Sequence, residues 1–145
     1  MRIVRLSVVA IVVATIAAGC GSANTIKVKG RLVKGGQPYI IKEKEGLRIF
    51  FEPEGGGEKA SAEKAGDSYS AQYDRADGTF HVTGKDGAGM PPGNYRILLE
   101  LRLNREDQFK GAFGKNSPLT CTIDSSNRDI VIDLDQKKAY PANGQ

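Results

Sequence analysis

The sequence predicts an all-β fold, a single antiparallel β-sandwich of about seven short strands. Hydrophobic and polar residues alternate with a period of two through most of the chain after residue 25, which is the pattern of half-buried strands. Glycine, proline, aspartate and asparagine interrupt this alternation at intervals of about one strand length. The one helix-like segment, residues 58–64, is too short to form a stable helix alone.

The alternating segments define the expected strands and their inward faces. Apolar residues occupy every second position in the segments 26–32, 47–51, 69–73, 80–82, 95–103, 119–123 and 130–134. Because successive side chains of a strand point to opposite faces, Cys121 is expected in the core as a small hydrophobic residue. By the same reasoning His81, Asp129, Asp133 and Asp135 are expected on the solvated face.

Two dipeptides predict tight turns. Asp77-Gly78 lies between two expected strands, as in a type I′ hairpin turn, whose two central residues both have positive φ. Pro92-Gly93 fits a type II turn, because proline fixes φ at the second position and glycine tolerates positive φ at the third. The segment 35–38, Gly-Gly-Gln-Pro, ends the first strand.

The first nineteen residues predict a cleavable export signal that is not part of the fold. Arg2 and Arg5 precede an uncharged, mainly apolar stretch over residues 6–18. As a helix, this stretch reaches about 20 Å, which is short of the roughly 30 Å hydrocarbon core of a bilayer.

The export signal ends in Ala17-Ala18-Gly19-Cys20, which resembles the lipobox of bacterial lipoproteins, with Ala17 at the position where leucine is commoner. The resemblance implies a diacylglycerol on the Cys20 sulfur, cleavage before Cys20, and a fatty acid such as palmitate on its new amine. Several acyl chains hold a protein on a membrane more firmly than one. Gly21, where an aspartate would favour the inner membrane, favours the outer membrane of the cell envelope. The alternative is a plainly secreted protein whose Cys20 is removed, free or disulfide-bonded.

We therefore divide the chain into a signal peptide (1–19), a membrane-proximal linker (20–25), a β-sandwich domain (26–136) and a flexible C-terminal tail (137–145). Removing 19 of the 145 residues leaves 126, and losing Arg2 and Arg5 lowers the formal charge from +4 to +2. So small a charge argues against nucleic-acid binding. Residues 21–25 span at most about 17 Å when extended, so the domain is expected close to the membrane.

Basic residues gather at the start of the domain. Residues 26–48 contain seven Lys and Arg against two Glu, and Lys27, Lys29 and Arg31 share the outward face of the first expected strand. This face is either an ordinary solvated surface on which lysines protect a sheet edge or a basic surface that meets anionic lipid headgroups.

Five short motifs, in this order, resemble carboxypeptidase regulatory-like domains over about residues 26–135. They are Val28–Leu32 with Gly36-Gln37-Pro38, Ile49–Pro53, Asp77–Phe80, Pro91–Ile97, and Ser117–Thr120 with Ile130–Leu134. The resemblance implies a transthyretin-like (immunoglobulin-like), seven-stranded β-sandwich that has no catalytic residues and no cofactor. The resemblance predicts the fold but not the function.

The residues themselves predict no enzyme and no metal site. His81 is the single histidine, and Ser61-x-x-Lys64 lacks the partner motifs of the penicillin-recognising enzymes that use this string. We expect a non-enzymatic binding or structural module that contacts an envelope protein or a polysaccharide through loops at one end of the sandwich, namely 53–67, 84–94 and 104–117.

Phe109 and Phe113 in the last of these loops are the expected contact residues, with Met90 in the second loop as a further apolar candidate. In the alternative all three cover the end of the sandwich. The competing function is a soluble secreted carrier that holds a small apolar ligand in the sandwich interior or in a dimer groove.

Overall fold

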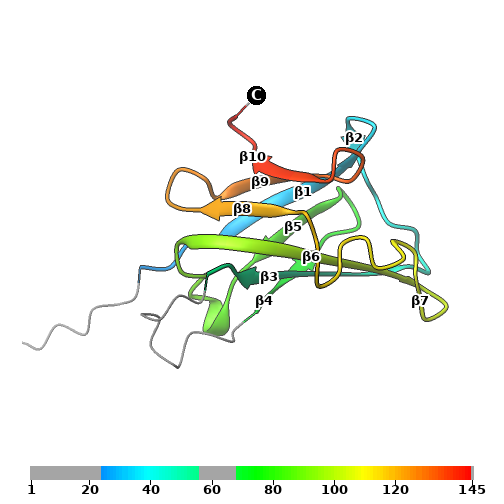
Figure 1. Cartoon of the computed structure of the whole chain (residues 1–145), viewed down its shortest axis with the longest axis horizontal. Coiled ribbons are helices and arrows are strands. Elements are labelled where there is room, and N and C mark those ends of the chain that lie inside the picture. Colours follow the sequence, from blue (N-terminus) through cyan, green and yellow to red (C-terminus); the bar gives the residue numbers. More distant parts are fainter. Residues whose placement is uncertain (1–23, 56–67, 145) are drawn as a thin grey trace, which may run out of the picture.

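The computed structural model describes residues 24–55 and 68–144, and Figure 1 shows them as an all-β molecule, as predicted. The strands are β1 (Val28–Lys34), β2 (Gln37–Pro38), β3 (Gly46–Pro53), β4 (Tyr69–Tyr73), β5 (Thr79–Val82), β6 (Gly93–Leu103), β7 (Glu106–Asp107), β8 (Thr120–Ile123), β9 (Asp129–Asp133) and β10 (Lys138–Pro141). One short 3-10 helix, η1 (Lys85–Gly87), lies between β5 and β6. Residues 58–64, the helix-like segment of the sequence, lie outside the described residues.

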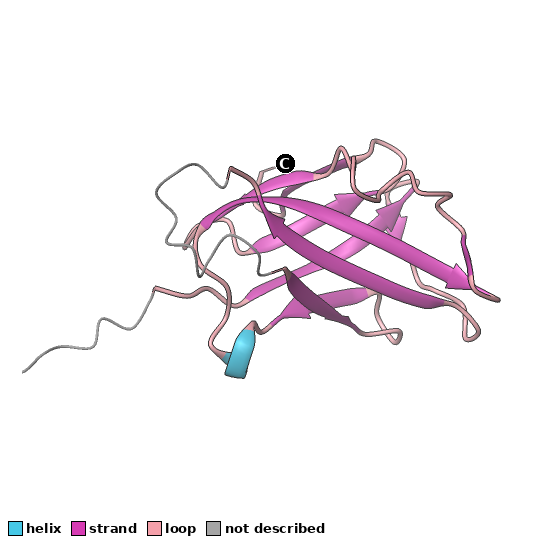
Figure 2. Cartoon of the chain, turned by 60° about the horizontal axis from the view of Figure 1, so that its bottom comes forward, coloured by secondary structure: helices cyan, strands magenta, loops and turns pink. Residues whose placement is uncertain are grey.

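The strands form one hydrogen-bonded sheet that curls back on itself. Its order is β10-β9-β1-β5-β4-β3-β6-β7, with β2 paired to β1 and β8 paired to β6. The curl brings the two halves of the sheet face to face (Figure 2), so that the Phe80 ring on β5 lies 6.1 Å from the Phe51 ring on β3. The core fills the space between the halves.

The sheet differs from the expected antiparallel sandwich of seven strands because β1 and β9 pair in parallel. Lys29 lies opposite Asp129, and Val33 lies opposite Asp133. A tight turn imposes antiparallel pairing only on the two strands that it joins. The strand before β9 is β8, which pairs with β6 in the other half of the sheet. The chain therefore crosses between the halves and enters β9 in the direction of β1.

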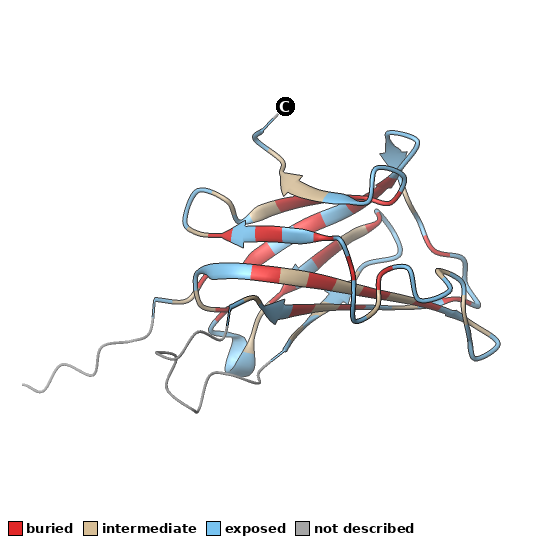
Figure 3. Ribbon diagram, viewed as in Figure 1, coloured by how far each residue is buried: buried red, intermediate tan, exposed pale blue. Residues whose placement is uncertain are grey.

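The inward faces predicted from the alternation are confirmed. Every predicted inward position is buried or half-buried, and Figure 3 shows the alternation along the strands. Asp133, expected on the solvated face, is only 6% exposed. Its Oδ1 accepts hydrogen bonds of 2.9 Å from the backbone N–H groups of Asp135 and Gln136. The buried carboxylate thus satisfies the backbone of the turn that leads from β9 to β10.

Both predicted turn types are wrong. Asp77-Gly78 does lie in the β4–β5 hairpin, but only Gly78 has positive φ (73°). The loop is longer than two residues, and the Gly78 N–H donates to the Asp74 carbonyl over 3.1 Å. Gly93 has no positive φ and begins β6. The Pro92-Gly93 pair therefore starts a strand instead of turning the chain.

The end of the chain is also more ordered than the expected flexible tail over 137–145. Lys138–Pro141 form β10, which pairs antiparallel with β9, and the Ala142 N–H donates to the Asp129 carbonyl over 2.8 Å. Pro141 is compatible with a strand here because β10 ends the sheet path, and proline is tolerated in edge strands.

The chain enters the fold at a fixed point. Ile26, which is 8% exposed, forms an isolated bridge with Met90, with N–H to carbonyl distances of 2.8 Å and 2.9 Å. Gly89 lies beside this bridge with φ 99°, and a Cβ there would lie 2.6 Å from the Ile26 carbonyl oxygen. The absence of a side chain at Gly89 thus lets the two backbones meet.

Gly30, at the centre of β1, has no room for a side chain. A Cβ at this position would overlap the Ile130 carbonyl oxygen of β9 and the Phe80 ring. The neighbouring strand and the aromatic core therefore both lie directly against the β1 backbone.

We predict that Gly30→Ala destabilises the protein by about 1–3 kcal/mol, because the added methyl overpacks the core. Gly46→Ala is the matched control, since a Cβ at Gly46 meets nothing within 4 Å. Chemical denaturation of both variants measures the effect. Equal stability of the two would contradict the close packing described here.

Candidate functional site

Lys29 lies exposed on the outer face of β1, as predicted, and Lys27 lies exposed directly before this strand. β1 has β5 on one side and β9 on the other. The Lys29 amine pairs with the Asp129 carboxylate at 3.1 Å. Protection of an edge therefore does not account for Lys29, because it stands in the interior of the sheet.

A hollow of about 320 Å³ opens on this outer face, and we call it the basic hollow. Lys27 and Lys29 line it together with Arg128, His81 and Thr83, and its lining has no acidic residue. The start of β1, the end of β5 and the approach to β9 meet here. The wall of the hollow also includes Val28 and Val82.

Arg128 is a member of this site that sequence reasoning missed. It precedes β9 directly, and its carbonyl accepts a 3.0 Å hydrogen bond from the Lys29 N–H. Arg128 lies about a hundred residues after Lys29 in the chain, and the parallel pairing of β1 with β9 brings them together. A pattern of local alternation holds no signal for this contact.

Arg31 does not join the basic hollow. It lines a different hollow of about 360 Å³, together with Val33, Val131, Asp133 and Tyr140. All three predicted basic residues are exposed, with Lys27 and Lys29 near the entry of the chain and Arg31 farther along β1.

A further hollow of about 400 Å³ lies between β8 and β10. Glu54, Asn94, Thr122 and Cys121 contribute to its lining. The Thr122 hydroxyl donates to the Asn94 side-chain oxygen over 2.8 Å, and Glu54 forms an ion pair with Arg96 at 2.7 Å. These polar groups are engaged with one another.

Phe113 belongs to the core and Phe109 packs against it. Phe113 is 4% exposed, and its ring meets the Phe109 ring edge to face at 5.1 Å. This arrangement corresponds to the alternative in which both residues cover the end of the sandwich. Phe113 offers almost no surface to a partner, and Met90 in the loop over 84–94 is fully buried in the core as well.

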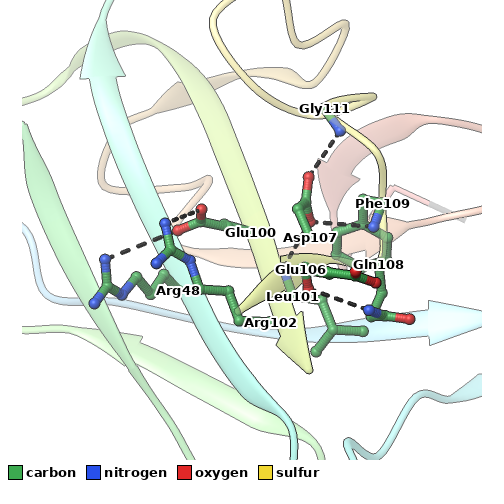
Figure 4. A network of polar contacts seen from close by, with 9 residues as sticks. All are labelled: Arg48, Glu100, Leu101, Arg102, Glu106, Asp107, Gln108, Phe109 and Gly111. Carbon is green, nitrogen blue, oxygen red and sulfur yellow. Dashed lines mark hydrogen bonds and ion pairs between the residues drawn. The ribbon is translucent and has the colours of Figure 1, made fainter. Parts of the chain in front are cut away.

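Asp107 organises the loop that carries the two phenylalanines (Figure 4). Its Oδ1 accepts hydrogen bonds from the backbone N–H groups of Leu101 and Phe109 at 3.2 Å and 3.1 Å, and its Oδ2 accepts one from the Gly111 N–H at 2.7 Å. On the neighbouring strands, Glu100 lies between Arg48 and Arg102. The role of Asp107 was not expected from the sequence.

Two of the three loops expected to form one contact surface leave β6 at its two ends. The loop over 84–94 leads into β6, whereas the loop over 104–117 follows its end. Because β6 is eleven residues long, the loop over 104–117 begins far from the loop over 84–94. It then runs back along β6, where the Leu99 N–H donates to the Phe113 carbonyl over 3.0 Å. Most of the third loop, residues 56–67, lies outside the described residues.

Cys121 is buried, as predicted, and is a free thiol. Burial, assisted by the charge of Glu54, raises its thiol pKa to about 12. Because the thiolate is the nucleophilic form, Cys121 is chemically inert at neutral pH. His81 is exposed, and its Nε2 lies 3.0 Å from the Gln72 side-chain oxygen.

Metal-binding clusters and membrane-spanning helices can be assessed for residues 24–55 and 68–144 alone. No three His, Cys, Asp or Glu side chains gather there in a way that could hold a metal ion. Within the same ranges, no helix has the length and apolar character required to cross a membrane. Cys20, the predicted lipidation site, lies outside these ranges.

No family model, curated protein or solved structure matches this chain.

We predict that Phe113→Ala lowers the free energy of unfolding by about 3–5 kcal/mol, as expected for a buried aromatic ring. Phe109→Ala is expected to cost less, because Phe109 is only half-buried. Denaturant titration compares the two variants. A Phe113→Ala variant as stable as the unmodified protein would return Phe113 to the candidate contact residues.

We predict that Cys121 reacts slowly with maleimide in the folded protein. In a Cys20→Ser background it is the sole thiol, and at pH 8 only about one thiol in ten thousand is ionised, given the raised pKa. Labelling followed by mass spectrometry is expected to be at least about a hundredfold faster in denaturant, where the thiol is exposed. Comparable rates in both states would show that β8 does not shield the thiol.

Proposed function

We propose that the protein is a lipid-anchored, extracytoplasmic module of the cell envelope that acts without catalysis, as a binding or structural domain. The observation that carries the proposal is the order of the N-terminal sequence, in which a charged start and an apolar stretch precede Ala17-Ala18-Gly19-Cys20. In the proposed mature protein, Cys20 is the first residue and bears the lipid. Gly21 favours the outer membrane as its location.

The point at which the fold begins supports this arrangement. Ile26 is the first buried residue that the structure describes, and its bridge with Met90 fixes the start of the domain. Five residues separate Cys20 from Ile26, which is about 17 Å of chain at full extension. An anchor at Cys20 would hold the domain directly against the membrane surface.

The two facing halves of the sheet are compatible with a transthyretin-like scaffold. The resemblance to carboxypeptidase regulatory-like domains is therefore kept as part of this proposal. The competing carrier function requires space for a ligand either in the interior or in a dimer groove, and the aromatic contacts bear on the interior alone. There the Phe51 ring contacts the Phe80 and Tyr95 rings at 6.1 Å and 6.4 Å. These rings occupy the centre of the sandwich, so we favour the anchored module.

The intact mass of the native protein from membrane fractions tests the anchor. We expect the mass of residues 20–145 plus acyl groups, with Cys121 as one hidden thiol. Cys20→Ser is expected to keep residues 1–19 and to incorporate no fatty acid, because the acceptor sulfur is gone. Cys121→Ser is the matched control and is expected to be lipidated normally. An unlipidated native mass would overturn the anchor and favour the soluble carrier.

A further inference from the structure

We propose that the basic hollow formed by Lys27, Lys29 and Arg128 binds the phosphate of an anionic lipid headgroup in the membrane that holds the protein. The inference rests on the proposed lipid anchor and names the second contact that the domain makes with its membrane. The proposed site differs from the basic surface predicted from the sequence, because it includes Arg128 and excludes Arg31.

The charges of the hollow fit a phosphate. Lys27 and Arg128 are exposed, and neither has an ion pair with a carboxylate in the described part of the chain. Lys29 shares its charge with Asp129 at 3.1 Å. An arginine guanidinium binds two phosphate oxygens at once, and a lysine adds a point charge. Two uncompensated cations therefore face one hollow whose lining has no acidic residue.

The size and walls of the hollow suit a headgroup. Its volume of about 320 Å³ lies at the lower end of the range for small-molecule sites. The accessible surface of its lining is mainly apolar, although Val28 and Val82 themselves are buried, and this surface suits the glycerol carbons next to the phosphate. The Thr83 hydroxyl is a further hydrogen-bonding group in the lining.

The position of the hollow favours a lipid over a free anion. Lys27 follows the entry point Ile26 directly, and six residues separate it from Cys20, a distance of about 21 Å at most. Once the acyl chains of Cys20 are inserted, headgroups surround the hollow at high effective concentration. A weak phosphate site that would stay empty in dilute solution would then be filled by its own membrane.

Protection of the Lys27 amine tests the proposal in the native, lipidated protein. The protein is reconstituted into vesicles of phosphatidylcholine alone or with about 30 mol% phosphatidylglycerol, and acetylation of individual lysines is followed by mass spectrometry. We expect Lys27 to react about fivefold more slowly on the anionic vesicles. Lys110, in the loop that follows β7 at the far end of the molecule (Figure 1), is expected to react equally on both.

Two charge reversals separate the hollow from general electrostatic attraction. Arg128→Glu is expected to abolish the protection of Lys27. Arg31→Glu makes the same change in charge at an exposed residue of β1 outside the hollow, and it is expected to keep the protection. Both side chains are exposed, so the thermal unfolding of both variants is expected to match that of the unmodified protein.

Each of the remaining outcomes would overturn either the headgroup site, the lipid occupant or the anchor. Equal Lys27 rates on the two vesicles, or equal loss of protection in both variants, refute the headgroup site while leaving the anchor intact. Equal protection on neutral vesicles with added inorganic phosphate assigns the hollow to a free anion and refutes a lipid occupant. A native protein that floats with neither vesicle refutes the anchor, and the headgroup site with it.

Discussion

The packing of Phe80 and the Ile130 carbonyl against the bare backbone of Gly30 is the contact on which the rest of the structure depends. Gly30 brings β9 and the aromatic core to the same point of β1. Phe80 then reaches across to Phe51 in the other half of the sheet. One residue without a side chain therefore sets both the pairing of β1 with β9 and the spacing of the two halves.

The outer surface follows from the same contact. The register that places Ile130 beside Gly30 also places Asp129 beside Lys29 and lets the Lys29 N–H bond to the Arg128 carbonyl. A shift of one residue would turn every side chain of β9 to the other face and would separate these charges. The basic hollow is thus a consequence of how the core packs.

Sequence reasoning succeeded where burial alone decides the outcome. The alternation in 95–103 and 119–123 predicts which side chains face inward, because a half-buried strand must turn its apolar side chains to the core. The parallel pairing of β9 could not be predicted, since it depends on a crossover between strands distant in the chain. Arg128 was missed for that reason, and Asp107 was missed because its bonds are made to the backbone of β6 and of the loop that follows.

The bridge between Ile26 and Met90 also determines how the domain responds to mechanical force. Tension applied through the N-terminal segment reaches the fold at two backbone hydrogen bonds of 2.8 Å and 2.9 Å before it reaches β1. Beyond them, β1 is bonded along both sides, to β5 and β9. The load is then shared among many bonds, so the domain is built to resist extraction by a pull from its N-terminus.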